Sequence, residues 1–242
     1  MIKNAFESIP IPPLLKDFSV WLNPKTTKVI SLKDTISVSK ELFSNKVDKV
    51  PKDIQVELSN GLEDSKKSLG LFALRIYFYQ IYRFSSFSLD LRKTRFNLAD
   101  HWTFRGEILA GSFPDGFISS LRTTYDGFFD GSDKKLREGL NGMGLMDKNW
   151  TTSDRDELTE LFKGHFRSNG QVKRNFKLSD MIHSFTNIFE YLRNKNSKID
   201  RNFLMLGVYL TSLYITLDPI AEELDVEECY KFSKKLAKKS VE

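Results

Sequence analysis

The sequence predicts a mostly α-helical protein: a two-lobed helical bundle with an extended N-terminal arm and at most one short β-hairpin. Three observations support this prediction. Apolar residues recur at helical spacing through most of the chain after residue 69, glycine and proline separate these periodic segments, and β-branched residues cluster in one short run. The 242 residues are enough for one large domain or two small lobes.

Residues 1–24 are predicted to form the arm. Four prolines, at positions 10, 12, 13 and 24, exclude a continuous helix and favour extended backbone. The arm either packs on the body of its own chain or docks on a neighbouring copy. The apolar residues that would contact a neighbouring copy are Ile9, Ile11, Leu14, Leu15 and Phe18.

The N-terminal lobe is assigned to residues 25–116. Residues 26–32 are its strand candidate because their run contains β-branched side chains. Pro51 begins a predicted helix that Gly61 stops. From Leu69 onward apolar residues occupy most faces of the next helix, which is typical of a buried central helix.

The end of this lobe is less regular. Residues 102–109 alternate between apolar and polar side chains and suit either a helix or a strand. Gly111, Pro114 and Gly116 then predict a turn before the next helix begins.

The C-terminal lobe is assigned to residues 117–220, where caps and breakers mark the helices. Ser132 is predicted to cap one helix. Ser153 and Asp156 predict the start of another, with an acidic side chain at the positive helix end. Pro219 ends the last helix of this lobe.

Residues 221–242 are predicted to form a C-terminal helix or arm. Its acids come early and its lysines late, an order that complements the helix dipole. Cys229, the single cysteine of the chain, lies on an apolar stripe and is interpreted as a buried structural thiol. One cysteine cannot form an internal disulfide, which fits a reducing, cytoplasmic compartment.

Aromatic and basic side chains interleave between Arg75 and Arg105, where six basic residues accompany only two acids. Cations neutralise phosphates and rings give bases a face to stack on, so this composition favours a groove for single-stranded nucleic acid. The basic candidates are Arg75, Arg83, Arg92, Lys93, Arg95 and Arg105. The base-stacking candidates are Tyr82, Phe84, Trp102 and Phe104. The alternative is that the rings are core residues and the cations an ordinary solvated face.

A second basic segment carries three further candidates for RNA contact, Lys173, Arg174 and Lys177. Glycines at 164 and 170 predict a loop here. This segment either closes over a strand of RNA or is simply a solvated loop.

No motif commits the chain to a reaction, so no enzymatic activity, metal or cofactor is expected. Three histidines, at positions 101, 165 and 183, fall in no metal-ligand spacing. The chain also lacks a glycine-rich phosphate loop followed by Lys-Ser or Lys-Thr. No apolar run approaches the roughly 20 residues that a membrane span needs.

Four short motifs together resemble the nucleoproteins of the peribunyaviruses. They are RIYF at 75–78, LRKTR at 91–95, Trp102 and FPDG at 113–116. The resemblance implies a two-lobed, mainly helical protein that holds viral RNA in a basic cleft and oligomerises by its terminal arms. It would place the protein in the cytoplasm or the virion, with Arg75, Arg92, Lys93 and Arg95 in the basic stretch.

The C-terminal half instead resembles the helical C-lobe of the AarF/UbiB atypical kinases. The similar segments are FFDGSDKKLREGLNGMGL, DRDELTELF and NFLMLGVYLTSLYITLDP. The metal- and nucleotide-binding motifs of that family are missing from this chain, so this resemblance implies a non-catalytic relic.

Two hypotheses follow. The first is a sequence-independent, single-stranded RNA-binding protein that forms homo-oligomers along RNA, as a nucleoprotein does. The alternative is a non-catalytic helical scaffold that binds proteins through its apolar arm and helical surface.

Overall fold

The computed structural model describes residue 42 and residues 47–106, 109–166 and 173–239. The predicted arm at 1–24, with its proposed contact residues, and the predicted strand at 26–32 lie outside this part of the chain.

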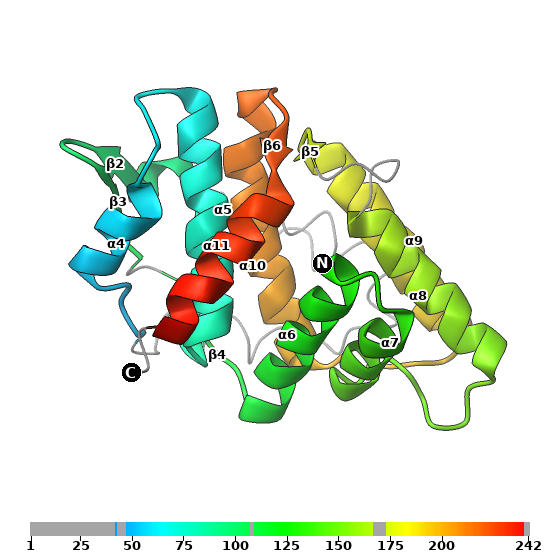
Figure 1. The fold of residues 1–242 in the computed structure, drawn as a ribbon. Helices are drawn as coiled ribbons and strands as arrows, with labels where there is room; N and C mark the ends of the chain where they lie inside the picture. The colour runs from blue at the N-terminus through cyan, green and yellow to red at the C-terminus, as the bar shows by residue number, and fades with distance from the viewer. Residues whose placement is uncertain (1–41, 43–46, 107–108, 167–172, 240–242) are drawn as a thin grey trace, which may run out of the picture.

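The described residues form a mostly α-helical protein, which confirms the predicted fold class (Figure 1). The helices are α4 (Lys52–Ser59), α5 (Lys66–Arg83), α6 (Asp115–Phe129), α7 (Asp133–Gly142), α8 (Thr152–Phe166), α9 (Leu178–Asn194), α10 (Arg201–Leu217) and α11 (Val226–Lys239). The strands pair antiparallel, β1 (Ser86–Ser88) with β4 (Ala110–Ser112), β2 (Phe96–Leu98) with β3 (Trp102–Phe104), and β5 (Lys173–Arg174) with β6 (Leu224–Asp225).

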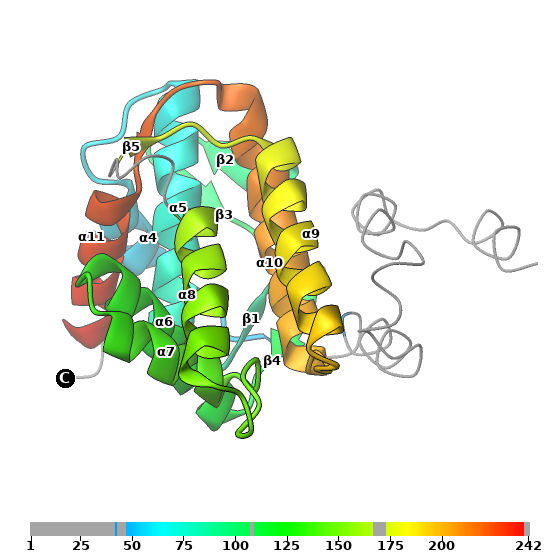
Figure 2. The ribbon, with the colours of Figure 1, turned by 90° about the vertical axis from the view of Figure 1, so that its right-hand side faces the viewer.

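Helix α5 is the predicted central helix, with α11 on one side and α10 on the other (Figure 1, Figure 2). Every residue from Phe72 to Ile81 is buried. Tyr77 stacks on Tyr209 of α10 with ring centroids 4.6 Å apart, and Phe78 meets Tyr230 of α11 edge-on at 5.7 Å. Burying a large apolar side chain contributes about 1.5–3 kcal/mol, so α5 organises the core.

One hydrophobic core runs through both predicted lobes. The ring of Tyr77 in α5 also packs edge-on against Tyr125 of α6, across the proposed boundary at residue 116. The buried apolar side chains of α5, α6, α9 and α10 belong to the same contiguous cluster. The division into lobes at 116 therefore stays a prediction.

Helices α6 and α7 form a tightly packed antiparallel pair because glycines let their backbones meet. A Cβ atom on Gly127 would lie 2.4 Å from the backbone nitrogen of Leu136. Ser132 caps α7 as predicted, since its Oγ accepts a hydrogen bond from the Lys135 backbone nitrogen at 3.4 Å. The close packing of α6 and α7 therefore depends on the absence of a side chain at Gly127 as well as on the Ser132 cap.

Replacing Gly127 with alanine is expected to lower the free energy of unfolding by about 1–3 kcal/mol, because the new methyl group forces two backbones apart. Gly116, in the first turn of α6, is the matched control because a Cβ there would meet nothing within 4 Å. Urea unfolding of both variants checks this prediction. Equal stability of the two variants would contradict the close approach of α6 and α7.

One local prediction is confirmed in part and another needs correction. Residues 102–104 form a strand, so the strand alternative is right for them, and the β2–β3 hairpin pairs Phe96 with Phe104. Gly111 is not in a turn: it lies in β4 opposite Phe87, where its missing side chain leaves room for Leu89. The pairing of β4 with distant β1 is a tertiary contact that local turn signals do not reveal.

The start of α8 also differs from the prediction. The reciprocal cap is made by Thr151 and Asp154, two residues earlier than Ser153 and Asp156. The Thr151 backbone nitrogen donates to Asp154 Oδ2 at 2.9 Å, and the Asp154 nitrogen donates to Thr151 Oγ1 at 3.2 Å. Both pairs have the same spacing, so the sequence pattern alone fits either register.

Helix α10 is the most apolar of the described helices. The stretch Arg201–Ile220 has a mean hydropathy of 1.5 and is long enough to cross a membrane. Of its window, 83% is buried inside the protein, as in the core helix of a globular fold. This stretch is an exception to the expectation that no apolar run approaches the length of a membrane span.

Candidate nucleic-acid interface

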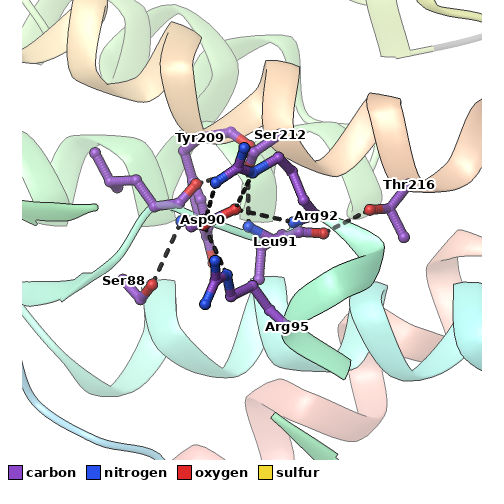
Figure 3. A network of polar contacts seen from close by, with 9 residues as sticks. Ser88, Asp90, Leu91, Arg92, Arg95, Tyr209, Ser212 and Thr216 are labelled. Atoms are coloured by element: carbon purple, nitrogen blue, oxygen red, sulfur yellow. Dashed lines mark hydrogen bonds and ion pairs between the residues drawn. The ribbon is translucent and has the colours of Figure 1, made fainter. Parts of the chain in front are cut away.

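The segment after β1 is fastened to the C-terminal half of α10 by two hydroxyl groups (Figure 3). Ser212 Oγ donates to the Leu89 carbonyl at 2.6 Å and accepts from the Leu91 backbone nitrogen at 3.0 Å. Thr216 Oγ1 donates to the Leu91 carbonyl at 2.7 Å. Sequence reasoning missed both hydroxyls, although two polar residues four apart in a very apolar helix are a detectable signal.

Asp90 lies between these anchored residues, with a fully buried side chain, and binds two arginines. Arg92 donates from Nε to Oδ1 and from Nη2 to Oδ2, both at 2.7 Å, which is a bidentate pair. Arg95 donates from Nε to Oδ2 at 2.9 Å. The hydrogen bond to Asp90 raises the pKa of Arg92 above its usual value, so its guanidinium group stays charged.

The β2–β3 hairpin brings a further cation beside this pair. The Arg105 backbone nitrogen donates to the Arg95 carbonyl at 2.8 Å, and both Arg105 and Lys93 are exposed. Neither of these two side chains forms an ion pair with any residue that the structure describes. We call Arg92, Lys93, Arg95 and Arg105 the basic cluster; with Asp90 it carries a net charge of about +3.

Arg92 and Arg95 are both held by Asp90 and are both partly exposed. Their side chains are 20% and 21% exposed, while Asp90 is inaccessible. Asp90 occupies two nitrogens of Arg92 and one of Arg95, which leaves the other guanidinium nitrogens without a hydrogen bond among the described residues. Two preoriented guanidinium groups with free N–H donors are suited to binding an oxyanion such as a phosphate.

The prediction that Arg75 contacts RNA is wrong, because its side chain is buried and hydrogen-bonded within the protein. Only 7% of the residue is exposed. Its Nη1 donates to the Leu58 and Asn60 carbonyls at 2.9 and 3.0 Å, and its Nη2 forms an ion pair with Glu228 at 3.1 Å. Arg75 therefore joins α4, α5 and α11.

Arg83 does not belong to the basic cluster. It ends α5 just before β1, and Figure 2 shows β1 and β4 at the opposite end of the molecule from β2. It is half-exposed and forms no ion pair with the described residues. Its contact with RNA stays a prediction, but at a separate position.

Two of the four predicted stacking rings are core residues. Trp102 and Phe104 are each 7% exposed, and Trp102 Nε1 donates to the Glu63 carbonyl at 3.2 Å. The Tyr82 hydroxyl donates to Asp126, which ties α5 to α6. The predictions for Trp102 and Phe104 are wrong because these rings pack inward. Tyr82 and Phe84 are half-buried, with Phe84 against Tyr79, and both stay predictions.

Asp126 gathers three donors that join α5, α6 and α11. Besides Tyr82, it accepts from the Tyr230 hydroxyl at 2.8 Å and from Lys234 Nζ at 2.6 Å. Burial opposes ionisation of this carboxyl, but these hydrogen bonds outweigh burial and hold its pKa below the usual value. The polar ends of two predicted nucleic-acid candidates, Tyr82 and Arg75, thus serve the fold.

The second basic segment packs on the other flank of α10. The guanidinium of Arg174 lies 5.8 Å from the ring of Tyr214, and its Nη1 donates to the His165 carbonyl at 2.5 Å. Lys177 pairs with Asp218 at 3.4 Å, and Lys173 lies opposite Asp225 in the β5–β6 pair. Asp218 therefore balances the charge of Lys177, Arg174 has a structural role, and contact of Lys173 with RNA stays a prediction.

The two basic segments share one helix but not one side of it. Ser212 and Tyr214 are two residues apart, which corresponds to about 200° around a helix. The segment at 89–95 thus contacts one flank of α10, and the segment at 173–177 contacts the opposite flank. The helix between them is about 10–12 Å in diameter with its side chains.

A groove between α8 and α9 is a poor place for RNA. It has a volume of about 870 Å³, and its lining includes the four acids Asp156, Glu157, Glu160 and Asp180. Carboxylates repel phosphates, so the acidic lining of this groove disfavours RNA. Among the residues that the structure describes, no three His, Cys, Asp or Glu side chains are grouped to hold a metal ion.

The comparisons with known proteins do not assign a class to this protein. No protein-family model matches the chain, and no curated protein matches it. The fold and the site together define a mostly helical protein with an exposed basic cluster built on a buried carboxylate.

Proposed function

We propose that this protein binds single-stranded RNA without sequence preference, as a nucleoprotein does, and that the basic cluster is its main contact with the phosphate backbone. The observation that carries the proposal is the buried Asp90, which holds the partly exposed Arg92 and Arg95. Beside them lie Lys93 and Arg105, two exposed cations that form no ion pair within the described part of the chain. Ordering these side chains in advance lowers the entropy that binding costs.

The chemistry of the cluster favours a phosphate over a base. Guanidinium groups match phosphate geometry with two parallel N–H donors, and the ammonium of Lys93 adds a flexible point charge. Two of the rings beside the cluster, Trp102 and Phe104, are buried, and Phe96 is half-buried against Phe104. Contacts to phosphates carry no sequence information, so binding would be sequence-independent.

Oligomerisation along RNA is the second part of the proposal. It depends on the arm at 1–24, whose apolar residues would dock on the neighbouring protomer. Deleting the arm is expected to remove oligomers while a single protein molecule still binds RNA.

Lys93 and Arg105 give the sharpest test of the interface because they carry no structural ion pair among the described residues. The double variant K93E/R105E is expected to weaken binding to labelled single-stranded RNA at least tenfold. The slope of log K against log salt should become shallower by about 1.4, since each phosphate contact on a single strand contributes about 0.7. Fluorescence anisotropy at several salt concentrations measures both quantities.

The control K148E/K198E changes the net charge by the same amount in two exposed loops. Lys198 precedes the N-terminus of α10, which is about 25 Å from its C-terminal end. If both double variants bind RNA equally well, the basic cluster is not the interface. If the wild-type protein binds no RNA at low salt, the scaffold hypothesis replaces this proposal.

A further inference from the structure

Helix α11 carries five lysines on one stripe. They are Lys231, Lys234, Lys235, Lys238 and Lys239. Their spacing is i, i+3, i+4, i+7 and i+8, which places all five on one face of a helix. Together with Asp130 and Tyr230 they line a groove of about 470 Å³.

The other face of α11 is fixed against the protein. Cys229, Ser233, Leu236 and Ala237 are buried, and Ser233 Oγ donates to the Arg75 carbonyl at 2.9 Å. The lysine stripe therefore cannot rotate toward the core. Because the apolar face is already covered, the helix also cannot insert that face into a lipid bilayer, as interfacial amphipathic helices do.

Only part of the positive charge on this stripe is balanced. Lys231 pairs with Glu227 at 2.5 Å, and Lys234 pairs with Asp126 at 2.6 Å. Lys235, Lys238 and Lys239 are exposed and form no ion pair with any residue described in the structure. Like charges at these spacings destabilise a helix, so a stripe of this kind requires an explanation.

The helix dipole explains only the end of the stripe. Cations stabilise the last turn of a helix, which here contains Lys238 and Lys239. Lys235 and the two lysines before it lie outside that turn. The dipole accounts for Lys238 and Lys239 and the ion pairs account for Lys231 and Lys234, so Lys235 is the lysine that neither effect explains.

We infer that the lysine stripe of α11 is a second binding surface for the phosphodiester backbone of the same single-stranded RNA. The inference rests on the proposed function. Lysines act as flexible point charges that accept any backbone conformation, which suits a strand bound without sequence preference. The Tyr230 ring at the groove is buried, so this surface offers phosphate contacts and no stacking.

The two surfaces lie on opposite sides of the central helix. The basic cluster belongs to the segment that packs on α10, whereas α11 covers the other side of α5 (Figure 2). A strand that contacts both surfaces therefore has to pass around an edge of the protein. Such wrapping predicts that long RNA gains from both surfaces.

The test compares K235E/K238E/K239E with the control K134E/K148E/K198E, which reverses three exposed lysines elsewhere. Binding to a single-stranded RNA of about 30 nucleotides is measured by anisotropy across a salt series. The α11 variant is expected to bind at least tenfold more weakly, with a salt slope shallower by about 2. Circular dichroism melting of each variant shows that the fold is intact.

The results distinguish failure of the inference about α11 from failure of the proposed function. If the α11 variant binds RNA like its control while K93E/R105E binds weakly, the inference is wrong and the basic cluster stands. If the wild-type protein binds no RNA, the proposed function itself fails. Cosedimentation with vesicles containing about 30% phosphatidylserine is measured in parallel; vesicle binding that depends on the three lysines, with RNA binding unchanged, overturns the inference in favour of a membrane surface.

Discussion

Replacing Asp90 with alanine is expected to lower the free energy of unfolding by about 3–5 kcal/mol, because it leaves two partly buried guanidinium groups without their carboxylate. Asp90 is fully buried and accepts three side-chain hydrogen bonds from Arg92 and Arg95. The ion pairs of Asp90 with both arginines also hold the segment at 89–95, which Ser212 and Thr216 fasten to α10. Urea unfolding followed by circular dichroism measures this effect.

Asp218 provides the control for this variant. Its pair with Lys177 is exposed on both sides and 3.4 Å long, so D218A should cost less than about 1 kcal/mol. A loss below 1 kcal/mol in D90A would show that the buried pair does not organise the loop. Charge reversal of Arg92 or Arg95 is an unsuitable test of RNA binding, because it would place a second carboxylate beside the buried carboxylate of Asp90.

The second large effect is a loss of stability in mild acid that depends on His165. This histidine is 2% exposed and its Nδ1 lies 3.1 Å from Ser184 Oγ. Burial, with a smaller contribution from the nearby charge of Arg174, lowers its pKa to about 3. The unfolded chain takes up this proton near pH 6.5, so between pH 6.5 and 3 the unfolded state binds more protons.

Stability is therefore expected to fall as the pH falls below 6.5, by about 1.4 kcal/mol per pH unit. The loss between pH 6.5 and pH 5 would be about 2 kcal/mol, and about 5 kcal/mol over the whole window. The variant H165N should show almost no dependence between pH 7 and pH 5, whereas H183N, which changes an exposed histidine of α9, should behave like the wild type. Identical pH profiles for wild type and H165N would contradict burial of a neutral imidazole.

Local sequence patterns predicted the helices well because helix formation leaves a periodic signal within one segment. The all-round apolar stretch from Leu69 is the buried α5, and Pro51, Ser132 and Pro219 mark helix ends as expected. The shift of one cap to Thr151 shows the limit of this reasoning, since equivalent cap patterns two residues apart differ only in the context of the packed helix.

The functional residues were harder to predict because exposure is a property of the whole fold. Arg75 has the composition of an RNA contact, but its partner Glu228 is 153 residues away. Trp102 and Phe104 fit a stacking surface equally well until α4 and α5 cover them. The structural role of Asp90 could not be predicted from the residues around it in the sequence either, because a single acid among cations indicates only a lower net charge.

The lysines of α11 were interpreted from the sequence as complements of the helix dipole. That interpretation fits the order of charges along the helix, and it overlooks their position around it. The structure adds that the opposite face is buried and that three of the lysines are exposed. The side of a helix that its cations occupy is therefore more informative about binding than the number of cations.

The most direct test of the RNA-binding proposal is an equilibrium titration of the purified wild-type protein with single-stranded RNA at several salt concentrations. Oligonucleotides of equal length and different sequence should bind with similar affinity, and log K should fall linearly with log salt, with a slope of at least about −3 if the four cations of the basic cluster each meet a phosphate. Absence of binding at 50 mM salt, or binding that does not change with salt, would contradict a phosphate-binding interface on this protein.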